Sequence, residues 1–111
     1  MAYREPAHWN PEAQGRRLGG EGRAALPDRA YAYVRTVDGK KVRKFPYMMV
    51  RDGKLVPSRK GCMSARNRAA QMISSRGMRE YIPVFNKMTR ILNSSFGYDL
   101  PTWAAHKKQR D

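Results

Sequence analysis

The chain has 111 residues, of which 23 are Lys or Arg and 9 are Asp or Glu, giving a formal net charge of +14 and a pI of about 10.6. This length predicts one small domain with a modest core, and the single cysteine excludes an internal disulfide framework. The charge excess predicts a polyanionic partner: nucleic acid first, an acidic protein surface or an anionic membrane second. No stretch approaches the roughly 18 apolar residues of a membrane span, and the polar N-terminal residues predict no secretory signal.

Residues 1–27 predict an irregular N-terminal arm. They contain three prolines and four glycines, with little apolar periodicity. Such a segment buries too little surface to offset the entropy lost on ordering. Its four basic and three acidic residues make it nearly neutral, so it is not a polybasic tail. Its aromatic residues Tyr3 and Trp9 are predicted to dock on a neighbouring molecule.

Residues 28–56 have the pattern of a small antiparallel meander. Alternation over 29–37 predicts a strand, and Asp38-Gly39 then predicts a hairpin turn, since both central positions of a type I′ turn take a positive φ. The return strand over 41–50 contains Pro46, which cannot donate to a strand ladder and therefore predicts an edge, a bulge or a break. Asp52-Gly53 predicts a second turn before a short strand at 54–56.

Two helices are expected after this meander. The first has Ser58 and Ser64 as alternative N-caps and ends at Gly77. The second covers 82–94 and carries the clearest apolar stripe in the chain, which we interpret as core. In the tail, Trp103 is expected either to pack on the domain or to dock on a partner. The predicted fold class is therefore α+β: a small antiparallel hairpin or meander followed by two helices, in a domain spanning 28–96 between the irregular arm at 1–27 and a C-terminal tail at 97–111.

Basic residues are concentrated in the hairpin and the first helix. Residues 28–55 hold eight basic and three acidic residues, and residues 56–79 hold six basic residues and no acidic ones. A basic surface with interleaved aromatic residues suits a phosphate backbone with stacked bases, although at least half of the hairpin's aromatic residues are expected to pack against the helices. The alternative is a helix whose charges are simply solvated. The predicted polyanion-binding residues are Lys40, Lys41, Arg43, Lys44, Arg59, Lys60, Arg66, Arg68 and Arg76.

No catalytic, cofactor or metal site is predicted. His8 and His106 lie in opposite tails, and Cys62 lies in a helix of small residues without a nameable partner for nucleophilic chemistry. No Cys and His spacing suits zinc, and no glycine-rich stretch has the context of a phosphate-binding loop. We therefore expect a protein that is not an enzyme.

One segment has a familiar order of motifs. Leu26-Pro27-Asp28 is followed by alternating Ala and Tyr, then by Gly53-Lys54-Leu55-Val56-Pro57, and then by Arg66-Asn67 before small residues. Over residues 26–73 this order resembles a small uncharacterised domain found in tailed-phage genomes near head-maturation protease genes. The chain departs from that domain at Ser64, near the place where a His commonly precedes the Arg-Asn pair. The resemblance implies a viral setting and assigns no functional residue.

Three functions fit these observations. The first is a non-enzymatic structural protein of a virion, packed against capsid proteins or packaged nucleic acid. The second is a stand-alone nucleic-acid-binding protein of the nucleoid type, in the cytoplasm or nucleoid. The third is a ribosomal or organellar-ribosomal protein, which the nearly neutral arm disfavours. All three predict a protein that is not secreted and belongs to a large assembly or binds nucleic acid.

Overall fold

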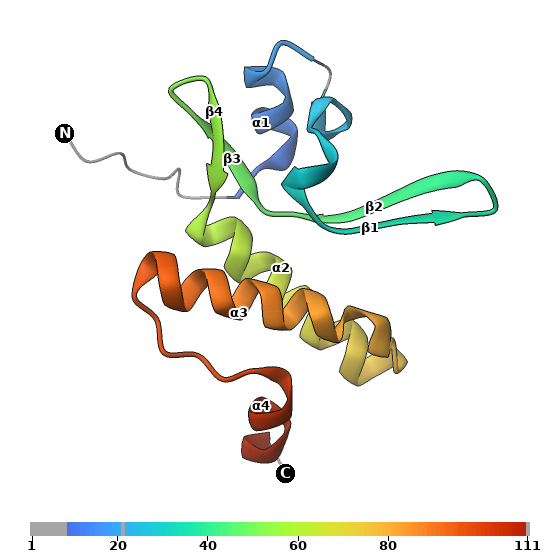
Figure 1. Ribbon diagram of the computed structural model, residues 1–111, viewed down its shortest axis with the longest axis vertical. Helices are drawn as coiled ribbons and strands as arrows, with labels where there is room; N and C mark the ends of the chain where they lie inside the picture. The colour runs from blue at the N-terminus through green and yellow to red at the C-terminus, as the bar shows by residue number, and fades with distance from the viewer. Residues whose placement is uncertain (1–8, 21, 111) are drawn as a thin grey trace.

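The computed structural model describes residues 9–20 and 22–110 and has the predicted α+β fold. Two short antiparallel hairpins, β1–β2 and β3–β4, lie beside a pair of packed helices, α2 and α3 (Figure 1). A short helix, α1, packs on β3, and a last helix, α4, follows α3. The elements are α1 (Pro11–Arg17), β1 (Tyr31–Val37), β2 (Lys40–Pro46), β3 (Met48–Arg51), β4 (Lys54–Pro57), α2 (Arg59–Arg76), α3 (Ile82–Phe96) and α4 (Trp103–Arg110), with short 3-10 turns η1 (Gly22–Ala25), η2 (Asp28–Ala30) and η3 (Arg79–Tyr81).

Both predicted hairpin turns are confirmed. Asp38 and Gly39 have φ of 52° and 75°, and Asp52 and Gly53 have φ of 51° and 74°. Left-handed backbone at both central positions defines a type I′ turn, and its twist matches that of the flanking strands. The β1–β2 hairpin projects away from the rest of the molecule (Figure 1).

The predicted break at Pro46 divides the return strand. Strand β2 ends at Pro46 and β3 begins at Met48, so the described residues form two separate two-stranded sheets. Tyr47 makes the corner between them: its N–H donates to the Ala30 carbonyl at 3.0 Å, and its carbonyl accepts from the Ser58 N–H at 2.9 Å. These two bonds hold the hairpins at the start of α2.

The two predicted helices are confirmed with their caps. Ser58, and not Ser64, caps α2, because its Oγ accepts a hydrogen bond from the Gly61 N–H at 2.9 Å. Gly77 ends α2 in the left-handed conformation at φ 65°. Gly61 is needed for a different reason: a Cβ there would lie 2.8 Å from the Tyr47 carbonyl oxygen and 3.0 Å from Trp9 Cη2.

The core lies between α2 and α3. Small side chains on α2 (Cys62, Ala65 and Ala69) let α3 approach closely. Burial of each large α3 side chain contributes roughly 1.5–3 kcal/mol. These α3 residues, Val84, Phe85, Met88 and Leu92, are at most 2% exposed. A second, smaller cluster of Leu26, Ala30 and Tyr31 lies under η2 and the base of β1.

The expectation of an irregular arm over residues 1–27 is wrong for its described part. Asn10 caps α1 by accepting a hydrogen bond from the Ala13 N–H at 3.2 Å, and Pro11 occupies the first turn, where its missing N–H is harmless. Helix α1 is then stabilised by tertiary contact. The buried Gln14 accepts from the Val50 N–H at 2.8 Å, and Arg17 donates to the Val50 carbonyl at 3.4 Å. Helix α1 thereby covers an edge of β3 that would otherwise be open.

Candidate nucleic-acid interface

A groove of about 440 Å³ lies between β2 and α2. Its lining brings together three of the predicted basic residues, Arg43 and Lys44 from β2 and Arg68 from α2. The remaining lining is aromatic, apolar or small, and no Asp or Glu belongs to it within the described part of the chain. These other residues are Trp9, Pro11, Phe45, Pro46, Ser64, Ala65, Met72 and Tyr81.

Tyr81 organises the β2 side of the groove. Its ring is 2% exposed and meets the rings of Tyr33 and Phe45 edge to face, with centroids 5.1 and 4.8 Å apart. Lys44 donates from Nζ to the Tyr81 hydroxyl at 3.2 Å and lies 5.9 Å from the ring centroid. The ammonium group is thus steered toward the groove by a neutral partner.

Phe45 has a strained backbone at this place. Its φ of 62° is left-handed, a conformation that bulky residues rarely adopt and that costs about 1–3 kcal/mol. The strain is offset by the packing of its ring against Tyr81 and by the backbone hydrogen bonds that hold the corner at Tyr47. The left-handed residue also interrupts the β1–β2 ladder, which pairs Tyr33 with Lys44 and resumes with Tyr31 and Pro46.

Arg43 and Lys41 are held by Asp28. Lys41 Nζ lies 2.8 Å from one carboxylate oxygen, and Arg43 Nη1 lies 3.6 Å from the other. Arg43 also donates to the Leu26 carbonyl at 2.6 Å and lies over the Tyr31 ring at 4.6 Å. The hydrogen bond from Lys41, with the nearby charge of Arg43, lowers the pKa of the Asp28 carboxyl. The Arg43 side chain is therefore held in position on one side of the groove, and the Asp28 carboxylate compensates part of its charge.

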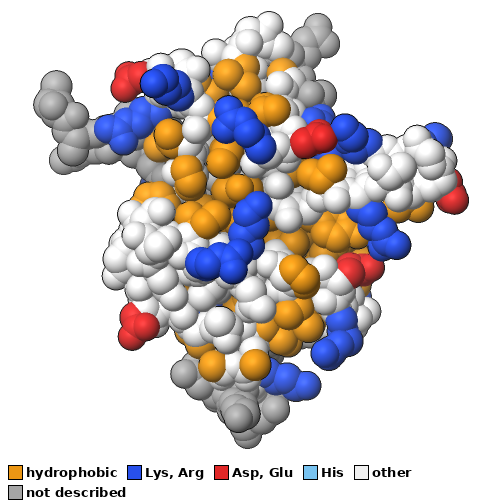
Figure 2. All heavy atoms as spheres, viewed as in Figure 1, with side chains coloured by type: hydrophobic (Ala, Val, Ile, Leu, Met, Phe, Trp, Pro, Cys, Tyr) orange, Lys and Arg blue, Asp and Glu red, His pale blue; other side chains and the backbone are white. Residues whose placement is uncertain are grey.

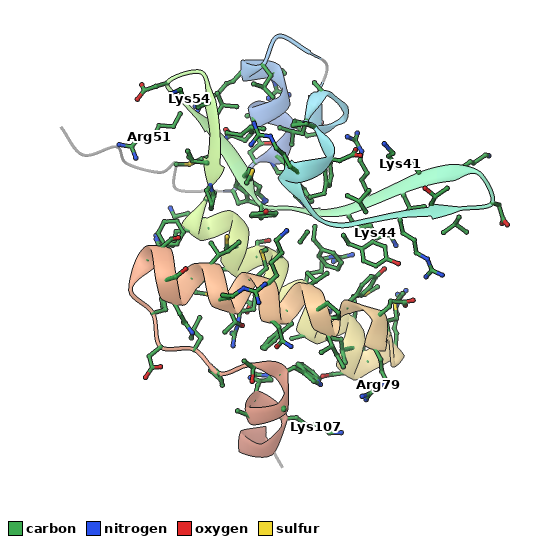
Figure 3. All side chains as sticks on the ribbon, viewed as in Figure 1. Lys41, Lys44, Arg51, Lys54, Arg79 and Lys107 are labelled. Carbon is green, nitrogen blue, oxygen red and sulfur yellow. The ribbon has the colours of Figure 1, made fainter. Side chains whose placement is uncertain are left out.

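The other predicted cations do not form one continuous surface with the groove. Figure 3 shows Lys41 and Lys44 on opposite sides of the β1–β2 hairpin, as strand alternation requires. Lys and Arg side chains are spread over the whole face in Figure 2 and do not gather in one patch. Lys40, Lys60 and Arg76 lie outside the groove lining, as does Arg59, which donates to the Tyr98 hydroxyl at 3.1 Å.

Arg68 is the most available cation of the groove. Its side chain is exposed, and no hydrogen bond or ion pair within the described residues involves it. Together, Lys44 from β2 and Arg68 from α2 place two positive charges on the groove without a carboxylate partner.

The expectation that Arg66 faces outward is wrong. Its residue is 7% exposed, its Nε donates to Thr89 Oγ1 at 2.7 Å, and its Nη2 donates to the Pro101 carbonyl at 2.9 Å. The guanidinium carbon lies 4.2 Å from the centroid of the Phe85 ring, and burial lowers the pKa of the guanidinium. The spacing of Cys62, Arg66, Ala69 and Ile73 puts Arg66 on the buried stripe, and this signal could have been recognised in the sequence.

The three predicted docking aromatics have different positions. Tyr3 lies outside the described residues. Trp9 is half-buried, packs near Gly61 and lines the groove, so its contact with a neighbouring molecule stays a prediction. Trp103 is not an external anchor, because it is 8% exposed and packs edge to face on Phe85 at 5.2 Å. The tail therefore packs on the domain, as the alternative interpretation of Trp103 predicted.

Sequence reasoning missed Tyr81 as the residue that joins the hairpin to the helices. It lies between the two helical segments, and no local pattern links it to β1 or β2.

Groups suited to other chemistry are not assembled in the described part of the chain. Cys62 is fully buried in the core. Within residues 9–20 and 22–110, no cluster of three or more His, Cys, Asp or Glu side chains could hold a metal ion, and no helix combines the length and apolar character needed to cross a bilayer. Comparisons with known protein families, with curated proteins and with solved structures find no match to this chain.

Proposed function

We propose that this chain is a non-enzymatic, small basic structural protein of a virion that contacts packaged nucleic acid through the groove between β2 and α2. The observation that supports this most is the convergence of Lys44 and Arg68 on one groove with aromatic walls and no acidic lining residue. Phosphate oxygens are the natural partners of two such cations. The virion setting is what the resemblance over residues 26–73 implies.

The packing of α3 favours contact with the nucleic-acid backbone over reading of base sequence. A helix-turn-helix protein needs an exposed second helix that enters the major groove. Helix α3 follows α2 through η3, but it buries Phe85, Met88 and Leu92 in the core. Lys and Arg side chains without a reading element position a backbone and do not specify a sequence. We therefore expect weak sequence preference.

Salt dependence of binding tests this function. If the groove and the surrounding cations neutralise roughly five phosphates of duplex DNA, the logarithm of the binding constant falls with the logarithm of salt with a slope near −4 or −5. The double variant Lys44→Gln with Arg68→Gln should weaken binding and flatten the slope by up to about 2. The matched control is Lys54→Gln with Lys107→Gln, which removes the same charge from exposed positions outside the groove (Figure 3).

Two outcomes would overturn the proposal. Association that does not respond to salt would exclude a phosphate partner. Equal losses of affinity for the groove pair and the control pair would show that charge alone matters and that the groove is not the binding site.

The virion setting is tested separately by mass spectrometry of purified particles. The chain should be found there at a fixed ratio to the major capsid protein. Recovery only in the particle-free fraction would refute that setting.

A further inference from the structure

We propose that the groove between β2 and α2 holds one unpaired nucleotide, and that this chain therefore prefers single-stranded nucleic acid to duplex. The base would stack on Trp9, and its phosphate would lie between Lys44 and Arg68. This inference rests on the proposed function and deepens it, because it names the form of nucleic acid that the groove accepts.

The groove has the size and the two kinds of lining that such a ligand needs. Its volume of about 440 Å³ falls in the range of sites for small organic ligands, about 300–1,000 Å³. One part of the lining is cationic, and the other includes Trp9 and Phe45. Base-paired nucleotides are already stacked inside the duplex, so a duplex offers this groove only its phosphates. An unpaired base can use both parts of the lining.

Trp9 is a suitable stacking platform because one edge of its ring packs against α2. The far edge of the indole, at Cη2, lies close to Gly61 on α2, where even a Cβ would come within 3.0 Å. The side chain is half-buried and lines the groove, so part of its surface remains accessible. A ring fixed before binding loses little conformational entropy when a base stacks on it.

Lys44 and Arg68 are the cations of the groove that are available to a phosphate. Arg68 has no hydrogen-bond or ion-pair partner among the described residues, and Lys44 is bound to the neutral Tyr81 hydroxyl. Arg43 differs, because Asp28 and the Leu26 carbonyl already hold it. The strained backbone of Phe45 follows Lys44 directly in the groove lining, and such strain is concentrated at ligand sites.

The test compares single-stranded and duplex DNA with equal numbers of phosphates, using the full chain. We expect oligo(dT) to bind more tightly than a hairpin duplex and to quench the fluorescence of Trp9. Trp103 contributes little to this change because it is buried in the core. Trp9→Leu keeps an apolar side chain but removes the aromatic face, and should weaken oligo(dT) binding by roughly 5- to 100-fold while leaving duplex binding unchanged. Trp9→Phe keeps a ring and should lose only a few-fold, with the same melting temperature as Trp9→Leu.

The outcomes separate this inference from the proposed function. One outcome is equal affinity for the two DNAs, no quenching of Trp9 fluorescence, and weaker binding by the Lys44→Gln, Arg68→Gln variant. This outcome would overturn the single-strand preference and leave the groove as a phosphate site. A Trp9→Leu variant that binds oligo(dT) as well as the wild-type chain would also overturn it. Failure to bind either DNA would overturn both proposals.

Discussion

Replacement of Arg66 by Ala should lower the stability of the folded domain, whereas replacement of Arg68 by Ala should leave it unchanged. Arg66 contributes two charge-assisted hydrogen bonds, to Thr89 Oγ1 and to the Pro101 carbonyl. Each such bond contributes about 1.5–3 kcal/mol, and the contact with the Phe85 ring adds about 0.5–2 kcal/mol. Two effects reduce the loss. The variant no longer has the cost of burying a charge, which is several kcal/mol, and Thr89 keeps its hydrogen bond to the Phe85 carbonyl. The net loss for Arg66→Ala should be about 2–4 kcal/mol.

Thermal unfolding followed by circular dichroism measures this loss. In a domain of roughly 100 residues, each kcal/mol lowers Tm by about 4 °C, so Arg66→Ala should lower Tm by about 8–16 °C. Arg68→Ala is the matched control, because it removes the same side chain from an exposed position on the same helix and should change stability by at most about 0.5 kcal/mol. Arg66→Met fills most of the space without a buried charge and should stay within about 1 kcal/mol of the wild-type chain.

Equal melting temperatures for Arg66→Ala and Arg68→Ala would refute the reasoning. Such a result would mean that the guanidinium of Arg66 is solvated in the folded state and that its bonds to α3 and the tail contribute nothing. Arg66 would then return to the set of cations available for a polyanion.

Three further predictions test other contacts. Pairing lowers the folded-state pKa of Asp28, so the stability that this residue contributes is present above its unfolded value of about 3.9 and is lost as pH falls through the lower folded value. Asp28→Asn should therefore melt below the wild-type chain at pH 7, and the difference in melting temperature should shrink as pH falls below the unfolded value. Gly61→Ala should lower the free energy of unfolding by about 1–3 kcal/mol, despite the better helix propensity of Ala, because its Cβ would press on the Tyr47 carbonyl. Ser64→Ala on the same helix should leave stability unchanged, and equal urea midpoints for the two variants would contradict this prediction. Gln14→Leu should remove the hydrogen-exchange protection of the Val50 amide, whereas unchanged protection would show that α1 does not cover β3.

The sequence by itself determined the turns, caps and helices of this protein, because their signals are local. Left-handed backbone at Asp38-Gly39 and Asp52-Gly53 is favoured by these residue types themselves, and Gly77 ends α2 in the same left-handed conformation. Pro46 interrupts its strand because it lacks an N–H. The apolar stripe of α3 identified the core, since its apolar residues lie on one side of the helix.

The tertiary structure alone decided which side chains remain available to a partner. The stripe of α2 includes the position of Arg66, but only the packing of α3 and the tail gives its guanidinium buried partners, at Thr89 and the Pro101 carbonyl. Helix α1 formed in a segment rich in glycine and proline because the edge of β3 provides Gln14 with a partner. The groove forms where β2 meets α2, and Tyr81 joins β2 to the helices there through Lys44 and Phe45. These contacts depend on residues distant in sequence, whose approach is determined by packing of the whole chain and by no local pattern.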